Sequence, residues 1–162
     1  MKHILLIGGA GYIGTVITKY LIDKNMKVRV LDNLLYDNKN VINKFLHLDD
    51  FSFVRGDLCS QSDVISSLDG ITDVIILGGL VGDPITKKYP GLNDKINDSG
   101  IKNCINALNN KKLNKVIFVS TCSNYGLIKD DQIADEDFEL KPLSLYSKAK
   151  VEIEKFILEK KM

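Results

Sequence analysis

Residues 1–17 read MKHILLIGGAGYIGTVI, and this stretch decides the fold. An apolar run meets four glycines, Gly8, Gly9, Gly11 and Gly14, after which the apolar residues resume. At a strand-to-helix junction, Gly8 permits a tight turn, Gly11 lets the backbone approach a pyrophosphate, and Gly14 lets the helix pack closely against the sheet. The helix N-terminus adds unpaired N–H groups and partial positive charge. The spacing is G-x-x-G-x-x-G, one residue longer at its front than the usual dinucleotide fingerprint.

Hydrophobic patterning continues as an alternation of short apolar runs and longer amphipathic stretches. The runs, rich in Ile and Val, predict buried strands at 3–7, 27–31, 52–54, 74–77 and 116–119. The stretches between them predict helices at 12–23, 41–48, 62–68, 92–108 and 145–159. This order predicts an α/β fold, a doubly wound parallel sheet of Rossmann type with about five strands and helices on both faces.

Composition sets limits on the class of protein. The chain has 162 residues, is 44% hydrophobic and carries a net charge of +1, which fits one domain over residues 1–162. There is no basic excess to indicate nucleic acid or a membrane surface, and the apolar runs are too short to span a bilayer. Cys59, Cys104 and Cys122 have no paired spacing, so we expect no disulfide framework, no metal site and a reducing cytoplasm.

Asp32 ends the second predicted strand, about 20 residues after the glycines, where a carboxylate accepts hydrogen bonds from the ribose hydroxyls of an adenosine. A carboxylate there repels a ribose phosphate, so it favours NAD over NADP. The alternative is that Asp32 is a turn residue before Asn33.

Two later segments carry polar side chains in the correct order along the chain after the glycine turn and Asp32. One is VSTCSNYG at 119–126, after the fifth predicted strand, and the other is LYSKAK at 145–150. Tyr146 and Lys150 are four residues apart, so on a helix they share one face.

The chain resembles the extended short-chain dehydrogenases/reductases, in particular the NAD-dependent nucleotide-sugar epimerase/dehydratase type. The resemblance spans essentially the whole chain and rests on Gly8-x-x-Gly11-Tyr12-Ile13-Gly14, Asp32-Asn33-Leu34, Gly56-Asp57-Leu58, Leu77-Gly78-Gly79, Asn97-x-x-Gly100, 121–126 and Pro142 to Lys150. It implies that the cofactor NAD is bound by Gly8, Gly11, Tyr12, Ile13, Gly14, Asp32, Asn33, Asp57, Leu58, Leu77, Gly78, Gly79, Asn97, Ser120, Tyr146 and Lys150.

The resemblance also implies three catalytic residues, Thr121, Tyr146 and Lys150. Tyr146 would be the base that takes the proton of a sugar hydroxyl, and Thr121 would orient that hydroxyl. The pKa of a free tyrosine is about 10, and the Lys150 ammonium and a nicotinamide cation would favour the phenolate.

Three departures from the family pattern qualify this prediction. Gly78 and Gly79 stand where the family usually has two alanines, so we expect cofactor binding to be kept but less rigid. Cys122 and Ser123 stand where the 4,6-dehydratases carry an acidic pair, which disfavours dehydration. Neither histidine lies near Cys122 in sequence, so we interpret this cysteine as a small packed residue.

The third departure is length, because family members are about twice as long. We therefore expect the chain to be the NAD-binding portion of a C4 or C3 epimerase of a UDP- or GDP-sugar, lacking the substrate-binding region. The alternatives are a cofactor-binding fragment without turnover, an NAD-dependent sugar ketoreductase and a dinucleotide-sensing regulatory protein. The apolar residues of the helices at 92–108 and 145–159 extend beyond one narrow stripe, and the resemblance implies that these helices pair across a two-fold axis in a homodimer. The alternative is that they only cover the sheet.

Overall fold

The computed structural model describes residues 1–109, 111–129 and 131–160. The chain divides into two compact units. Unit 1 comprises Met1–Gly79 and Asn103–Val119, and unit 2 comprises Leu80–Lys102 and Ser120–Met162. The prediction of a single domain over residues 1–162 stays a prediction.

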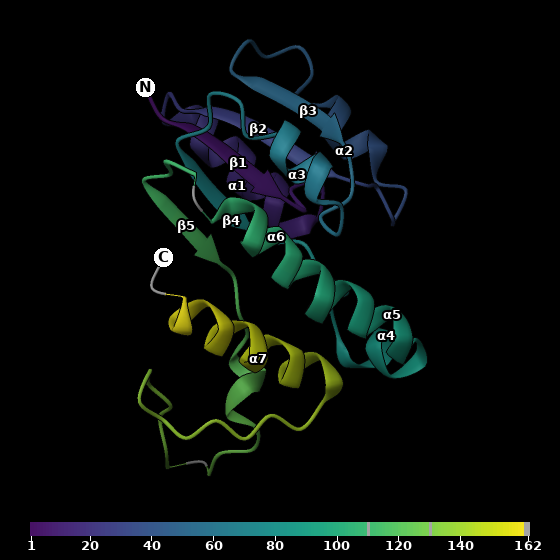
Figure 1. Cartoon of the computed structure of the whole chain (residues 1–162), viewed down its shortest axis with the longest axis vertical. Coiled ribbons are helices and arrows are strands. Elements are labelled where there is room, and N and C mark those ends of the chain that lie inside the picture. Colours follow the sequence, from purple (N-terminus) through teal and green to yellow (C-terminus); the bar gives the residue numbers. More distant parts are fainter. Residues whose placement is uncertain (110, 130, 161–162) are drawn as a thin grey trace. The chain divides into compact units, whose positions relative to one another are not determined.

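Unit 1 is built on one parallel sheet of five strands (Figure 1). The strands are β1 (His3–Ile7), β2 (Lys27–Asp32), β3 (Phe51–Arg55), β4 (Asp73–Ile76) and β5 (Lys115–Phe118), in the spatial order β3-β2-β1-β4-β5. The chain starts in the middle, moves to one edge and returns past β1 to the other edge, so the strand order reverses beside β1. Such a reversal point is where open α/β sheets bind ligands, at the carboxyl ends of the strands. The predicted fold class is confirmed.

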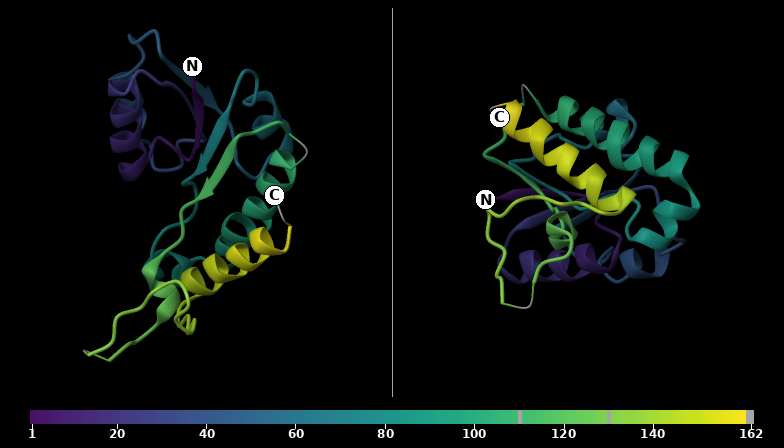
Figure 2. Two further views of the ribbon diagram at one scale, coloured as in Figure 1. Left: turned by 90° about the vertical axis from the view of Figure 1, so that its left-hand side faces the viewer. Right: turned by 90° about the horizontal axis from the view of Figure 1, so that it is seen from below.

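Helices cover both faces of this sheet (Figure 2). On one face lie α1 (Tyr12–Asp23) and the short α2 (Lys39–Asn43), and on the other lie α3 (Gln61–Ser66) and α6 (Ile101–Leu108). Helix α1 stops where Asn25 takes a left-handed φ of 59°, a common way to end a helix. Helix α2 is shorter than the predicted 41–48. The division between the units falls inside α6, after Lys102.

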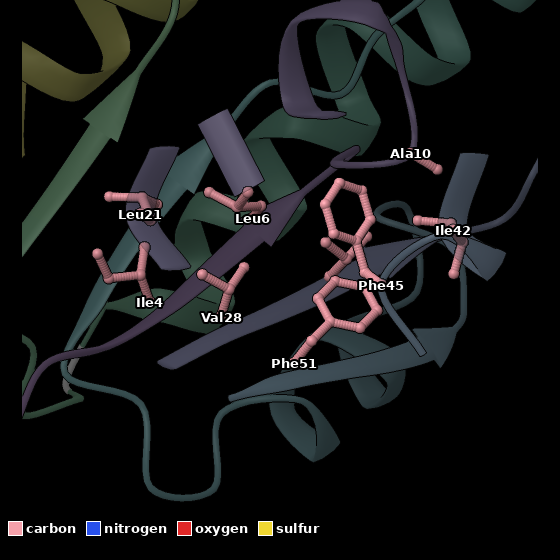
Figure 3. Close-up of a cluster of buried hydrophobic side chains, with 9 residues drawn as sticks. Ile4, Leu6, Ala10, Leu21, Val28, Ile42, Phe45 and Phe51 are labelled. Atoms are coloured by element: carbon pink, nitrogen blue, oxygen red, sulfur yellow. The ribbon is translucent and has the colours of Figure 1, made fainter. Parts of the chain in front are cut away.

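The core of unit 1 follows the alternation of the strands. Ile4, Leu6 and Val28 point to the α1 face, where they meet Ala10, Leu21, Ile42, Phe45 and Phe51 (Figure 3). Val30 belongs to the same cluster. The rings of Phe45 and Phe51 lie 5.4 Å apart between centroids. Intervening residues such as Leu5 and Ile7 are also fully buried. Burial on both faces accounts for the apolar run from Ile4 to Ile7 in β1, and each such side chain contributes about 1.5–3 kcal/mol.

Strand β5 differs from the predicted buried strand. It lies at the edge of the sheet, paired with β4 along one side, and its residues alternate between exposed and half-buried. Ile117 is 43% exposed. An apolar edge of this kind can pair with a further strand.

Unit 2 is helical. It contains α4 (Asp83–Lys88), α5 (Pro90–Asn93), the π-helix η1 (Asp94–Gly100), the 3₁₀ helix η2 (Cys122–Tyr125) and α7 (Leu145–Glu159). Helix α7 packs against η1, α4, α5 and η2. It starts in a capping box, because Ser144 accepts from the Ser147 N–H and the Ser147 side chain reaches back to the Ser144 N–H.

The predicted continuous helix at 92–108 was wrong in detail. It begins as α5, continues as the π-helix η1 and becomes regular only in α6. Asn93 and Asn97 are buried in this stretch and bond to each other, with 2.9 Å between Asn97 Nδ2 and Asn93 Oδ1. A π-helical turn inside a longer helix is frequent at functional sites.

No helix among the described residues is both long and apolar enough to cross a membrane.

Candidate functional site

The turn between β1 and α1 is held by close backbone contacts. Gly8 has a φ of +79°, and a Cβ at this position would overlap the Cα and N of Gly78 at the end of β4. A Cβ on Gly14 would lie 2.6 Å from the Cα of Gly9. Gly14 therefore allows the helix to approach the turn itself, whereas we had expected close packing against the sheet. These two positions need glycine because the protein's own backbone occupies the space.

Gly11 differs from Gly8 and Gly14, because a Cβ added to it would make only an ordinary van der Waals contact. A Cβ there would lie 3.7 Å from the Gly8 carbonyl oxygen, and the φ of −75° suits any residue. The protein itself therefore does not require glycine at this position. Gly11 is the N-cap of α1, and it has no side chain with which to cap the first N–H groups. A small residue beside unpaired helix N–H groups fits a bound phosphate.

Asp32 orients the same turn. Its Oδ2 accepts from the Ala10 N–H at 3.0 Å, and its Oδ1 accepts from the Leu34 N–H at 2.8 Å. The Asn38 amide donates to the carbonyl of the same residue, Ala10. Asp32 thus stabilises the turn that follows β2, which was the alternative interpretation of this residue. Each of its oxygens also keeps a lone pair that could accept from a ribose hydroxyl. Asn33 makes a local bond, accepting from the Leu35 N–H at 3.0 Å.

The loop after β3 lies beside Asp32. The Gly56 N–H donates to the Asp32 carbonyl at 3.2 Å, and Asp57 Oδ1 accepts from the Cys59 N–H at 2.9 Å. The Asp57 N–H donates to the Asp63 carboxylate, which lowers the pKa of Asp63. Leu58 packs over the end of β4, since a Cβ on Gly78 would lie 2.7 Å from Leu58 Cδ2.

The structure therefore gathers most of the predicted cofactor residues at the carboxyl ends of β1, β2, β3 and β4. These are Gly8, Gly11, Tyr12, Ile13, Gly14, Asp32, Asn33, Asp57, Leu58, Leu77, Gly78 and Gly79. The side chains of Tyr12 and Ile13 are 90% and 56% exposed in the first turn of α1. The roles assigned to these residues stay predictions.

In unit 2, Asn97 fixes the backbone after β4. Its Oδ1 accepts from the Leu80 N–H at 2.7 Å, and its Nδ2 donates to the Leu80 carbonyl at 2.8 Å. Asn97 is 1% exposed. In this structure it holds Leu80, and the predicted cofactor contact of Asn97 stays a prediction.

Ser120 and Thr121 lie where the chain enters η2. Thr121 is the N-cap of η2, and its Oγ1 accepts from the Ser123 N–H at 3.3 Å. The Ser120 hydroxyl accepts from the Asn124 amide at 3.1 Å. Cys122 is exposed, so its interpretation as a packed residue was wrong. The buried cysteine is Cys104, and burial raises the pKa of its thiol to about 12.

Tyr146 and Lys150 lie on α7, as their spacing predicts. The Lys150 ammonium lies 5.8 Å from the centroid of the Tyr146 ring. Lys150 is 3% exposed, and this burial lowers its pKa to about 8, partly offset by Glu154. Burial raises the pKa of Tyr146, and Asp83 and Cys122 raise it further. The direction of this shift is therefore opposite to the lowering that we expected.

Sequence reasoning missed several polar residues of these regions. Asn38 supports the glycine turn, Asp83 acts on Tyr146, and Asn124 and Glu154 bond to each other at 2.9 Å. The sequence could have indicated Glu154, because it lies one helical turn after Lys150 on the same predicted helix. Asn124 stood inside the quoted VSTCSNYG motif, but its partner is 30 residues away.

Among the described residues, no group of three or more His, Cys, Asp or Glu side chains is placed to hold a metal ion.

The sheet order, the glycine turn and the acidic strand end define a dinucleotide-binding domain of the doubly wound class. Residues 4–160 match the model of the NAD dependent epimerase/dehydratase family, and the chain belongs to that family.

Three relatives illustrate the family's range. UDP-glucose 4-epimerase of Lacticaseibacillus casei is 28% identical over 159 residues, which cover 95% of this chain and 45% of the relative. The human sterol-4-alpha-carboxylate 3-dehydrogenase (decarboxylating) is 27% identical, over 97% of this chain and 39% of its own length. The crystal structure of Thermus thermophilus UDP-glucose 4-epimerase with NAD has a TM-score of 0.85 at 26% identity, covering 96% of this chain and 49% of that one. The chain thus spans about half the length of these relatives or less.

Proposed function

We propose that this chain binds NAD and forms the cofactor-binding part of a nucleotide-sugar epimerase. Gly11 carries the proposal. It is the position in the turn that has room for a side chain within the protein and lies at the uncapped start of α1. A phosphate-binding role explains a glycine that the fold does not need. Family membership and the NAD-bound relative from Thermus thermophilus support the choice of NAD.

The residues of unit 1 fit the two ends of the adenosine diphosphate half of NAD. The N–H groups at the start of α1 would hold the pyrophosphate, and the free lone pairs of Asp32 would accept from the ribose hydroxyls. Asp57 and Leu58 would lie beside the adenine. When bound, NAD supplies a hydride acceptor and a positive charge on its nicotinamide ring.

The residues of unit 2 fit the chemistry of a sugar hydroxyl. The Tyr146 phenolate oxygen would accept the hydroxyl proton, and the Thr121 hydroxyl would orient the same oxygen. The Lys150 ammonium favours the phenolate and can hold a ribose hydroxyl. Burial and Asp83 raise the pKa of Tyr146, and a positive charge bound beside the phenol would oppose that shift.

Calorimetric titration with NAD tests the binding half of this proposal. We expect wild-type chain to bind, and Gly11→Val to bind at least tenfold more weakly, because a side chain would occupy the pyrophosphate path. Gly91→Val is the matched control, since a Cβ on Gly91 would meet no other described segment within 4 Å and Gly91 lies in unit 2. Absence of binding by the wild type, or equal binding by Gly11→Val, would overturn the proposal.

A panel of UDP- and GDP-sugars tests the catalytic half. Epimer formation without net NADH identifies an epimerase. Stoichiometric NADH identifies a dehydrogenase, the second candidate, which the sterol dehydrogenase relative favours. NAD binding with no turnover identifies a cofactor-binding module. In a preparation that turns over, Tyr146→Phe should lower the rate by about a hundredfold or more while NAD affinity changes far less.

The nucleotide-sugar substrate, a homodimer and a cytoplasmic location complete the proposal. A homodimer is supported by exposed apolar residues on α5 and α7, with Leu92 36% and Leu158 78% exposed. Light scattering that gives a particle of 18.1 kDa at high micromolar concentration would contradict it. The cytoplasm is supported by the cysteine usage, and cell fractionation tests it.

A further inference from the structure

The buried amide of Asn124 connects two segments of unit 2. Its Nδ2 donates to Ser120 Oγ at 3.1 Å and to Glu154 Oε1 at 2.9 Å. Asn124 is 2% exposed. One amide group therefore joins the segment that carries Thr121 to the helix that carries Tyr146 and Lys150.

The orientation of this amide is set by Glu154. The Asn124 Oδ1 is buried and has no hydrogen-bond partner among the described residues, and an unpaired buried acceptor is unfavourable. Turning the amide over would place that oxygen against the Glu154 carboxylate, which accepts hydrogen bonds only. A charged acceptor makes the stronger bond, so Nδ2 faces Glu154 and the oxygen stays unpaired.

Glu154 follows Lys150 by one helical turn, so the two side chains share a face of α7. Burial lowers the pKa of the Lys150 ammonium to about 8, and the Glu154 carboxylate opposes that shift. The carboxylate thus acts on a buried ammonium one helical turn away.

We propose that Asn124 and Glu154 are positioning residues: Asn124 holds the Glu154 carboxylate in place, and the carboxylate keeps the Lys150 side chain charged. The same amide fixes the segment that carries Thr121. The importance of this charge for catalysis rests on the proposed function, but the effect on Lys150 itself does not.

Other charged groups lie on the elements packed against α7. Helix α4 carries Asp83, Lys87 and Lys88, η1 carries Asp94, Lys95 and Asp98, η2 carries the Cys122 thiol and the Tyr125 phenol, and α5 carries no titratable residue. Asp98 pairs with Lys102 at 2.5 Å. Asp83 and Cys122 act on the pKa of Tyr146, and Glu154 acts on that of Lys150.

Nuclear magnetic resonance of labelled lysine side chains tests this proposal on the chain itself. The Lys150 signal is assigned by its loss in Lys150→Arg, and its titration is followed with pH. Glu154→Gln removes the charge but keeps an amide oxygen that can accept from Asn124. We expect the midpoint of Lys150 to move to lower pH in Glu154→Gln. Asn124→Ala should move it in the same direction but less, because Glu154 is then free to turn into solvent.

The double variant and a control sharpen the test. If Asn124 acts through Glu154, then Asn124→Ala adds no further shift in the Glu154→Gln background. Glu152→Gln is the matched control, since Glu152 is an exposed carboxylate of α7 that pairs with Lys155 at 2.9 Å. We expect no shift of Lys150 in this control.

An unchanged Lys150 midpoint in Glu154→Gln would overturn the proposal, as would an equal shift in Glu152→Gln. An additive effect of Asn124→Ala would refute the role of Asn124. NAD titration on the same samples keeps the two proposals apart. If the wild type does not bind NAD but the Lys150 midpoint shifts as expected, the proposed function alone is refuted. If the wild type binds NAD but the Lys150 midpoint does not shift, only this inference is refuted.

Discussion

The turn after β1 and the helix α7 differ in what their residues need from their surroundings. In the turn, Gly8 and Gly14 leave out side chains so that segments of backbone can touch, and Gly11 leaves open space at the start of α1. On α7, the chain buries Lys150 and half-buries Tyr146, which shifts the pKa of both from their ordinary values. The comparison teaches that the turn depends on backbone segments being close together, so that one added methyl group would push them apart. The helix depends on the protonation states of two side chains, so that the loss of one proton changes its charge.

The largest expected effect compares two glycines of the same turn. Gly8→Ala should destabilise the chain by on the order of 4 kcal/mol or more, because the new Cβ would overlap the Gly78 backbone at a left-handed φ. Gly11→Ala should change stability by less than about 1 kcal/mol, since its φ and surroundings accept a side chain. Urea unfolding measures both, and equal losses would show that Gly11 also serves the fold.

The second prediction concerns the buried charge. Lys150→Met should stabilise the chain at pH 7 by up to about 3 kcal/mol, because the wild type pays for burying an ammonium whose pKa has fallen from 10.5 to about 8. As pH rises from about 8 towards 10.5, the unfolded wild type still binds this proton and the folded one does not, so the wild type gains stability and the difference closes.

Thermal or urea unfolding at several pH values measures this difference. Lys148→Met is the control, since Lys148 is exposed on the same helix and its replacement should change stability little. A Lys150→Met variant that is less stable than the wild type at pH 7 would contradict the prediction.

The third prediction returns to unit 1. If Asp32 faces the adenosine ribose, NAD should bind at least tenfold more tightly than NADP, or about 1.4 kcal/mol. Asp37→Asn should keep this preference, because Asp37 is an exposed residue of the same loop, with 88% of its side chain accessible. Calorimetry with both cofactors decides, and equal affinities for the wild type would remove Asp32 from the site.

The smallest expected effect concerns the charged groups that act on the pKa of Tyr146. Asp83→Asn should lower the pKa of the phenol, since the carboxylate disfavours the phenolate. Glu136→Gln, an exposed carboxylate of unit 2, should leave it unchanged. Titration of ring-labelled tyrosine followed by nuclear magnetic resonance measures both shifts. Addition of NAD should lower the same pKa, and a rise would contradict the role given to the nicotinamide charge.

The sequence by itself determined the fold class and the place of the glycine turn. Both depend on local patterns, namely apolar runs of strand length and glycines at a strand end, which act before distant residues meet. The Tyr146–Lys150 pair was equally local, because helical spacing alone puts the two on one face.

Only the tertiary structure determined the features that depend on contacts between residues far apart in the sequence. It showed β5 at a half-exposed edge, Cys122 in solvent and a π-helix around the buried Asn93 and Asn97. It paired Asn124 with Glu154 across 30 residues and set the directions of the pKa shifts of Tyr146 and Lys150. Burial and a buried polar partner depend on the packing of segments far apart in the chain, and no spacing along the sequence records that packing.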